Sequence, residues 1–129
     1  MPHYRVKARN LGTLDDFTRA YLEAAEWCGL YGAEQEEALD LAASPKWDRR
    51  SITLAREDCD DFRALVGDLL AGIDEAQAGM DFWLTRNRHG AGFWDRGLGG
   101  AGEQLTELAH GYGEAHAWFD ADTETLSLE

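Results

Sequence analysis

The residues best equipped for chemistry gather in one stretch, DFWLTRNRHGAGFWDRG, at residues 81–97. His89 and Asp95 supply an imidazole and a carboxylate, a combination that can move protons. The same stretch contains three arginines, Arg86, Arg88 and Arg96. Because guanidinium groups stabilise phosphates and developing negative charge, one hypothesis is an enzyme or a phosphate-ligand protein centred on His89 and Asp95.

No recognised catalytic motif supports this first hypothesis. The chain contains no H-E-x-x-H, C-x-x-C, P-loop or G-x-S-x-G sequence. The run HGAG lacks the strand-then-helix context that a phosphate-binding loop needs. His89, His110 and His116 lie outside any recognised metal-ligand spacing. We therefore expect a protein that is not an enzyme and that has no metal site and no cofactor.

Two Phe-Trp pairs within the stretch support a different interpretation. Phe82-Trp83 and Phe93-Trp94 flank a glycine-rich turn, which predicts an antiparallel hairpin over residues 82–96. These aromatic pairs can simply cover a helix face as part of the core. Adjacent residues on a strand point to opposite faces, however, so one aromatic of each pair is expected to face away from the helices. The docking surface predicted on this basis consists of Trp83, Arg86, Arg88, His89, Trp94 and Arg96.

The charge of the chain indicates the kind of partner to expect. With 25 acidic and 12 basic residues, the net charge is −13, more than solubility requires. This charge opposes direct binding to nucleic acid or to an anionic membrane, and it suits a partner protein with a basic surface. Solvation alone is the alternative explanation. Besides a basic N-terminal segment, Lys46, Arg49 and Arg50 form a small basic cluster.

Some of the acidic residues recur at helical spacing. Glu57, Asp61 and Asp68 lie four and seven residues apart, which places them on one side of a helix. A second such row on the first predicted helix is Asp16, Glu23 and Glu26. A continuous row of carboxylates can imitate the phosphates of DNA and occupy the basic groove of another protein.

The elements that must position these residues are helices first and a small sheet afterwards. Apolar spacing predicts a first helix with its N-cap at Thr13, a second over residues 33–43, and a third that ends near Ala71. The inward residues expected on the first helix are Leu14, Phe17, Tyr21, Ala24, Ala25 and Cys28, and those on the third are Leu54, Phe62, Leu65 and Leu69. Asp58 interrupts the apolar face of the third helix, so it is either an anomaly or an N-cap.

The remaining segments complete the predicted fold. Residues 44–50 resemble a loop, residues 102–112 form a helix, and the chain after it makes a hairpin that turns around Asp120–Thr123. The fold class is therefore α+β: N-terminal helices packed on a small antiparallel sheet of two hairpins with one intervening helix. We expect a basic N-terminal segment at residues 1–12 and a single domain at residues 13–129.

The apolar segments and the two cysteines indicate the cell compartment in which we expect the protein. No run of eighteen apolar residues and no secretory signal are present, so we expect a cytoplasmic protein and no membrane partner. Cys28 and Cys59 are expected to be reduced thiols, although a disulfide between their helices remains open.

The block DFWLTRN…HGAGFWDRG resembles one found in small proteins of tailed bacteriophages and mobile elements. A helix of the form A-Y-[IL]-E-x-A-x-W is matched by residues 20–27, and a D-C-x-x-F element by residues 58–62. Arg88 stands where the family block has a glycine, so we expect a longer turn that uses Gly90 and Gly92 for positive backbone angles. The resemblance implies an accessory role in a host cell and no particular chemistry.

Together these observations favour a small acidic accessory protein that binds a host macromolecule. The most specific form of this hypothesis is a DNA-mimic-like inhibitor of a host defence protein, such as a restriction enzyme or a CRISPR effector, or of a regulatory protein. The alternative is the enzyme or phosphate-ligand protein centred on His89 and Asp95. The residues that separate the two are Glu57, Asp61 and Asp68 for the inhibitor, and His89 and Asp95 for the enzyme.

Overall fold

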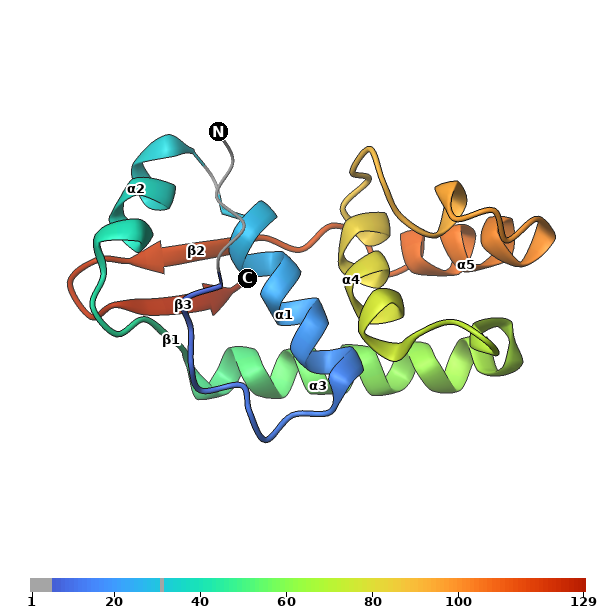
Figure 1. Ribbon diagram of the computed structural model, residues 1–129, viewed down its shortest axis with the longest axis horizontal. Coiled ribbons are helices and arrows are strands. Elements are labelled where there is room, and N and C mark those ends of the chain that lie inside the picture. The colour runs from blue at the N-terminus through green and yellow to red at the C-terminus, as the bar shows by residue number, and fades with distance from the viewer. Residues whose placement is uncertain (1–5, 31) are drawn as a thin grey trace.

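Five α-helices and three short strands form the part of the chain that the computed structural model describes, residues 6–30 and 32–129 (Figure 1). The helices are α1 (Asp16–Cys28), α2 (Ala33–Leu41), α3 (Arg49–Val66), α4 (Glu75–Arg86) and α5 (Gly100–His110). The strands are β1 (Lys46–Trp47), β2 (Ala117–Asp120) and β3 (Thr125–Leu128), and two 3-10 helices are η1 (Gly67–Leu70) and η2 (Phe93–Asp95). The predicted α+β class is confirmed. No described helix is both long and apolar enough to cross a membrane.

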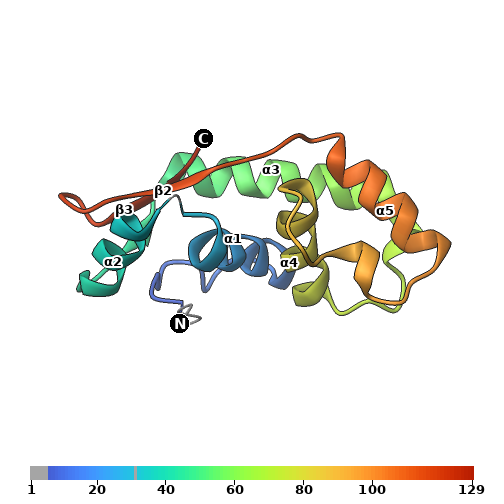
Figure 2. The ribbon, with the colours of Figure 1, turned by 90° about the horizontal axis from the view of Figure 1, so that it is seen from above.

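Helix α3 is the longest of these helices, and the other elements are distributed along it (Figures 1 and 2). The sheet and α2 lie at its N-terminal end, and α5 lies at its C-terminal end. Helices α1 and α4 pack against each other in the middle, where Gly79 allows the close approach. A Cβ atom added at Gly79 would lie 2.0 Å from the carbonyl oxygen of Phe17.

The sheet is mixed, with the strand order β1-β3-β2. Strands β2 and β3 form the predicted C-terminal hairpin, in which Trp118 pairs with Ser127 and Phe119 with Leu126. Strand β1 was expected to be loop, but it adds to β3 in parallel. The prediction of two antiparallel hairpins is therefore wrong. A parallel partner arrives from far away in the sequence, so no local turn signal announces it.

Side-chain amides cover both edges of this small sheet. The Asn10 side chain donates to the carbonyl of Trp47 at 2.9 Å and accepts from its N–H at 3.2 Å. At the other edge, Gln35 Oε1 of α2 accepts the N–H of Phe119 at 2.9 Å. These contacts satisfy backbone groups that would otherwise offer a template for pairing with another strand.

The hairpin predicted over residues 82–96 does not form. Phe82 and Trp83 belong to α4, and Phe93–Asp95 is the 3-10 helix η2. Every residue of α4 from Asp81 to Arg86 is buried, so this helix lacks the polar face that makes a helical period visible in a sequence. The Phe82 ring stacks on Phe62 with the ring centroids 4.1 Å apart. This burial outweighs the preference of aromatic residues for strands.

The predicted core face of the first helix is confirmed. One residue that was expected on the opposite, exposed face is buried instead. The N-cap of the helix is Asp15 rather than Thr13, and the Asp15 carboxylate accepts the N–H of Thr18 at 3.0 Å. Glu26 was expected to point outward but is buried, because its carboxylate accepts the N–H groups of Lys7 and Ala8 at 2.6 and 3.3 Å. Burial raises the pKa of Glu26, and the two backbone donors oppose that effect.

The third helix corrects three predictions. It ends at Val66, where Gly67 has a φ of +52°, and the chain continues as η1. Leu65 was expected to face the core, yet 55% of it is exposed. Asp58 is an interior residue of α3 and not an N-cap.

The N-terminal segment of residues 1–12 is described only from residue 6 onward, so Arg5 lies outside the described residues. Within the described part, Ala8 and Leu11 are buried in the core. Lys7 Nζ donates to the carbonyls of Asp40 and Ala42 at 2.6 and 2.8 Å. This part of the segment is therefore packed on the domain. Cys28 and Cys59 are both free thiols.

Candidate functional site

The residues proposed for a docking surface at positions 81–97 are divided between the interior and the exterior. Trp83 is fully buried and meets Tyr21 edge-on, with the ring centroids 5.2 Å apart. Arg86 is also buried. Trp94 is 54% exposed, Arg88 and Arg96 also face outward, and His89 is half-buried. The predicted docking surface is wrong for Trp83 and Arg86, because a helix rather than a strand carries them.

Arg86 is the centre of a hydrogen-bond network between four parts of the chain. Its guanidinium donates to Tyr21 Oη and to Asp58 Oδ2, each at 2.9 Å. It also donates to the carbonyls of Gly113 at 2.9 Å and Tyr112 at 3.1 Å. Burial lowers the pKa of Arg86, but Tyr21 and Asp58 outweigh burial and hold the pKa above its ordinary value. The network therefore joins α1, α3, α4 and the segment after α5.

Two aromatic rings enclose the same guanidinium. The Arg86 Cζ atom lies 5.7 Å from the ring centroids of both Phe82 and Tyr112, within the range of cation–π contacts. The hydroxyl of Tyr112 in turn donates to Asp61. With four hydrogen bonds made and its faces covered, Arg86 is held within the fold and stabilises it.

The guanidinium of Arg96 is also bound to a side chain of the fold. Its Nη2 and Nε atoms donate to Asp81 Oδ1 at 2.8 Å and Oδ2 at 3.1 Å, so the pair is bidentate. The Asp81 side chain is only 1% exposed, and Gln77 supplies it with a further donor at 2.9 Å. A buried carboxylate needs such partners, because an unpaired one would cost several kcal/mol. The pair ties the segment after η2 to α4.

His89 and Asp95, the two residues of the enzyme hypothesis, have separate local roles. The N–H of His89 donates to the carbonyl of Leu84 at 2.9 Å, which closes the turn after α4. Asp95 Oδ1 accepts the N–H of Gly92 at 3.0 Å and thereby caps η2. No hydrogen bond joins the His89 and Asp95 side chains, although the structure describes both residues.

The turn itself uses positive backbone angles, as predicted, but only partly at the predicted positions. Arg88 adopts a φ of +56°, whereas Gly90 is not among the positive-φ glycines. Gly92 is one of them, and a Cβ atom there would lie 2.3 Å from Thr85 Oγ1. Thr85 Oγ1 accepts the N–H of Phe93 at 3.1 Å, so Gly92 lets the chain pass close to α4.

The acidic residues singled out on the third helix are exposed, as their spacing suggests. Glu57 and Asp61 lie on α3, four residues apart, and Asp68 follows on η1. The three do not share one helix, because the chain changes direction at Gly67. None of the three forms a salt bridge within the described part of the chain. We refer to Glu57, Asp61 and Asp68 as the acidic side.

The other acidic row, predicted on the first helix, is not a free surface. Asp16 and Glu23 pair with Arg19 at 2.7 and 3.8 Å, and Glu26 is buried. The neighbours of the acidic side on α3 are also neutralised, since Asp58 pairs with Arg86 and Asp60 with Arg63. The acidic side therefore differs from these carboxylates in lacking any cationic partner.

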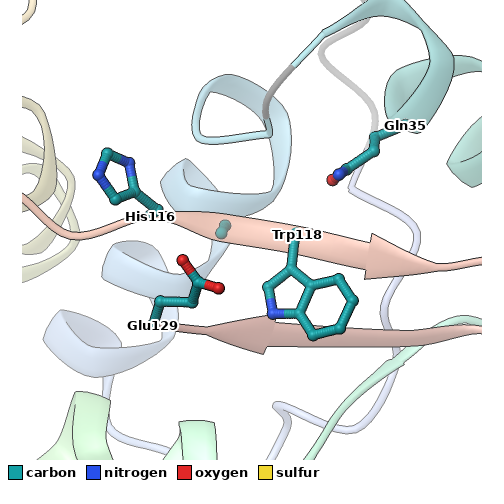
Figure 3. Close-up of a pocket in the computed structure, with 5 residues that line it drawn as sticks. Gln35, His116, Trp118 and Glu129 are labelled. Carbon is teal, nitrogen blue, oxygen red and sulfur yellow. The ribbon is translucent and has the colours of Figure 1, made fainter.

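A shallow pocket of about 320 Å³ opens at the edge of the sheet (Figure 3). Gln35 reaches it from α2, and His116, Trp118 and Glu129 reach it from the hairpin. In this view the Glu129 carboxylate lies between His116 and Trp118, and 41% of Trp118 is exposed. An indole ring beside a carboxylate can hold a cationic side chain. Sequence reasoning missed this site, because the alternation that marks β2 does not show which of its faces is open.

No group of three or more potential metal ligands lies together among residues 6–30 and 32–129. Comparison of the chain with family models, with characterised proteins and with solved structures finds no match.

Proposed function

We propose that this protein acts by binding another macromolecule through the acidic side, and that the partner presents a basic surface. The observation that carries the proposal is the contrast within α3. Asp58 and Asp60 have arginine partners at 2.9 and 2.6 Å, whereas Glu57 and Asp61 have none among the residues that the structure describes. Unpaired carboxylates on a rigid helix are ready to meet cations of a partner, because none of their own ion pairs must first be broken.

An exposed apolar residue lies among these carboxylates. Leu65 is four residues after Asp61 on α3 and three residues before Asp68. Its 55% exposure is unusual on a helix whose Phe62 and Val66 are buried. An apolar contact surrounded by polar groups is the arrangement of many protein–protein interfaces. Leu65 supplies that contact in our proposal.

The net charge defines the class of partner. At −13, the protein repels nucleic acid and attracts proteins that bind nucleic acid through basic grooves. The resemblance of residues 81–97 to phage and mobile-element proteins favours a partner in the host cell, in a defence or regulatory role. In the most specific form of the proposal, the acidic side occupies the groove that DNA would otherwise fill.

Salt dependence and competition test the proposal with an identified partner. After affinity capture from host lysate, the partner is purified and its Kd is measured over a series of NaCl concentrations. We expect affinity to fall steeply with salt, since exposed charges are screened beyond about 8–10 Å at physiological ionic strength. Double-stranded DNA should displace the protein if the partner uses its nucleic-acid groove. An affinity that does not change with salt would contradict the proposal.

A further inference from the structure

A basic pocket of about 620 Å³ lies where β1 joins the N-terminal half of α3. Three cationic residues line it: Lys46 on β1, and Arg49 and Arg56 on α3. The volume falls within the range of small-molecule sites, about 300–1,000 Å³. We refer to Lys46, Arg49 and Arg56 as the basic pocket.

The helix sets the spacing of the cations. Arg49 and Arg56 are seven residues apart, so they lie on one face of α3 with about 10 Å between them along the axis. Ile52 and Thr53 lie on the same face between them and also line the pocket. Lys46 adds the third cation from the adjoining strand. The pocket thus presents positive charge along about two helical turns.

The cations of this pocket have no anionic partner in the described structure. Arg49 and Arg56 form no salt bridge within residues 6–30 and 32–129, and the only bond of Lys46 Nζ there is a 3.5 Å contact with the carbonyl of Thr123. The one carboxylate of the pocket, Asp48, is already engaged. It accepts from the backbone N–H of Ser51 at 2.7 Å and from Ser127 Oγ at 2.6 Å.

The unpaired cations of the basic pocket contrast with four arginines elsewhere in the molecule. Arg19, Arg63, Arg86 and Arg96 all pair with carboxylates, as expected when 25 acidic residues surround 12 basic ones. Arg49 also stands in the first turn of α3, where a cation opposes the helix dipole. A ligand with negative charge would relieve both this effect and the mutual repulsion of the three cations.

We infer that the basic pocket binds a small di- or polyphosphate compound. Arginine forks bind phosphate oxygens in a bidentate manner, and cations about 10 Å apart suit a ligand with more than one phosphate group. The net charge of −13 opposes a long polyanion such as nucleic acid, whereas a small ligand interacts mainly with the three cations of the pocket. This inference is independent of the function proposed for the acidic side.

Thermal unfolding of the full chain tests this inference. The probes are inorganic phosphate, pyrophosphate, tripolyphosphate and a nucleoside triphosphate, each compared with NaCl at the same ionic strength. We expect Tm to rise by roughly 5–10 °C at ligand concentrations about 100 times Kd, with tripolyphosphate more effective than phosphate. A larger effect of the nucleoside triphosphate would identify the ligand as a nucleotide, and equal effects would identify it as the phosphate chain alone.

Two variants connect the effect to the pocket. In Arg49→Gln/Arg56→Gln the rise in Tm should be lost, while the unliganded protein should still fold, because both arginines are exposed and neither forms a salt bridge within the described part of the chain. The matched control is Arg50→Gln, an exposed arginine in the same helical turn as Arg49 that does not line the pocket, and this variant should keep the full rise. No rise in the wild type at millimolar tripolyphosphate, or an equal rise in the double variant, would overturn the inference. Tighter binding of single-stranded DNA than of tripolyphosphate through the same arginines would also overturn it.

Discussion

Helix α4 and the outer side of α3 use the same kinds of residue in opposite ways. In α4 and the segment after it, Arg86 and Arg96 donate to carboxylates and the Trp83 ring is buried. On α3, Glu57 and Asp61 are exposed beside Leu65, and neither has a cationic partner among the described residues, although Asp61 accepts from the Tyr112 hydroxyl. A charged side chain thus stabilises the fold in one region and remains available to a partner in the other. Pairing and burial separate the two roles, and residue type does not.

The largest expected effect distinguishes two tryptophans that the sequence places in equivalent pairs. Trp83→Ala should lower the free energy of unfolding by about 3–5 kcal/mol, because it opens a cavity against Tyr21 in the core. Trp94→Ala should change it by less than about 1 kcal/mol, because that side chain is largely in solvent. Urea denaturation measures both values. Equal losses in the two variants would break the distinction between the buried and the exposed aromatic.

Two arginines of the same stretch provide the next test. Arg86→Met should destabilise the protein by about 2–4 kcal/mol, since it leaves the buried Tyr21 hydroxyl and two backbone carbonyls without their donor. The broken Arg86–Asp58 ion pair contributes less to this destabilisation, because 42% of the Asp58 side chain is exposed and water can solvate it. Arg88→Met is the control and should stay within about 0.5 kcal/mol of the wild type. A small effect at Arg86 would show that the network adds little stability.

Replacing Asp48, at the junction of α3 and the sheet, should cause a smaller loss of stability that depends on pH. Burial raises the pKa of Asp48, but the hydrogen bonds from Ser127 and Ser51 outweigh burial and hold the pKa below its ordinary value. A lowered pKa means that the ionised Asp48 stabilises the fold above its ordinary pKa, and that this stability is lost as the pH falls through the folded-state pKa. Asp48→Asn should cost about 1 kcal/mol at neutral pH, because the neutral amide weakens the charge-assisted hydrogen bonds from Ser51 and Ser127. The difference in unfolding free energy from the wild type should shrink below about pH 3.8, and a difference that is independent of pH would contradict this assignment.

The parts of the fold that the sequence predicts well are those with one polar and one apolar side. Helix α1 shows this pattern, and its inward residues Phe17 and Tyr21 were identified correctly. Helix α4 is buried on all sides along its last two turns, so aromatic β-propensity gave the wrong answer there. Strand β1 has two residues and pairs in parallel with β3, and neither property leaves a local signal.

For the candidate site, too, the sequence predicted one part correctly and left another part undetected. Helical spacing correctly indicated that Glu57 and Asp61 are exposed, because they follow the face opposite to the core. Which carboxylates are neutralised could not be predicted, since the Arg86–Asp58 and Arg96–Asp81 pairs join residues 28 and 15 positions apart. The basic pocket was visible only as a cluster of residue types, and Arg56 joins it from about two turns further along the same face of α3.

The most direct test of the account is to reverse the acidic side and compare it with an equal reversal elsewhere. The test variant is Glu57→Lys/Asp61→Lys/Asp68→Lys, and the matched control on α2 is Glu34→Lys/Glu36→Lys/Glu37→Lys, which changes the net charge equally. Both sets of side chains are exposed, and α2 lies at the opposite end of α3 (Figure 1). The α3 reversal removes the acceptor of the Tyr112 hydroxyl, so it should lower the stability of the fold by about 1–2 kcal/mol and leave the protein folded.

Affinity for the partner identified by capture, measured at low salt, is the deciding quantity. We expect the α3 variant to lose most of its affinity, because cations replace the carboxylates that face the basic surface of the partner. The α2 variant should keep most of its affinity. Equal losses in the two variants would show that only the overall charge matters. Unchanged affinity in the α3 variant would contradict the account directly.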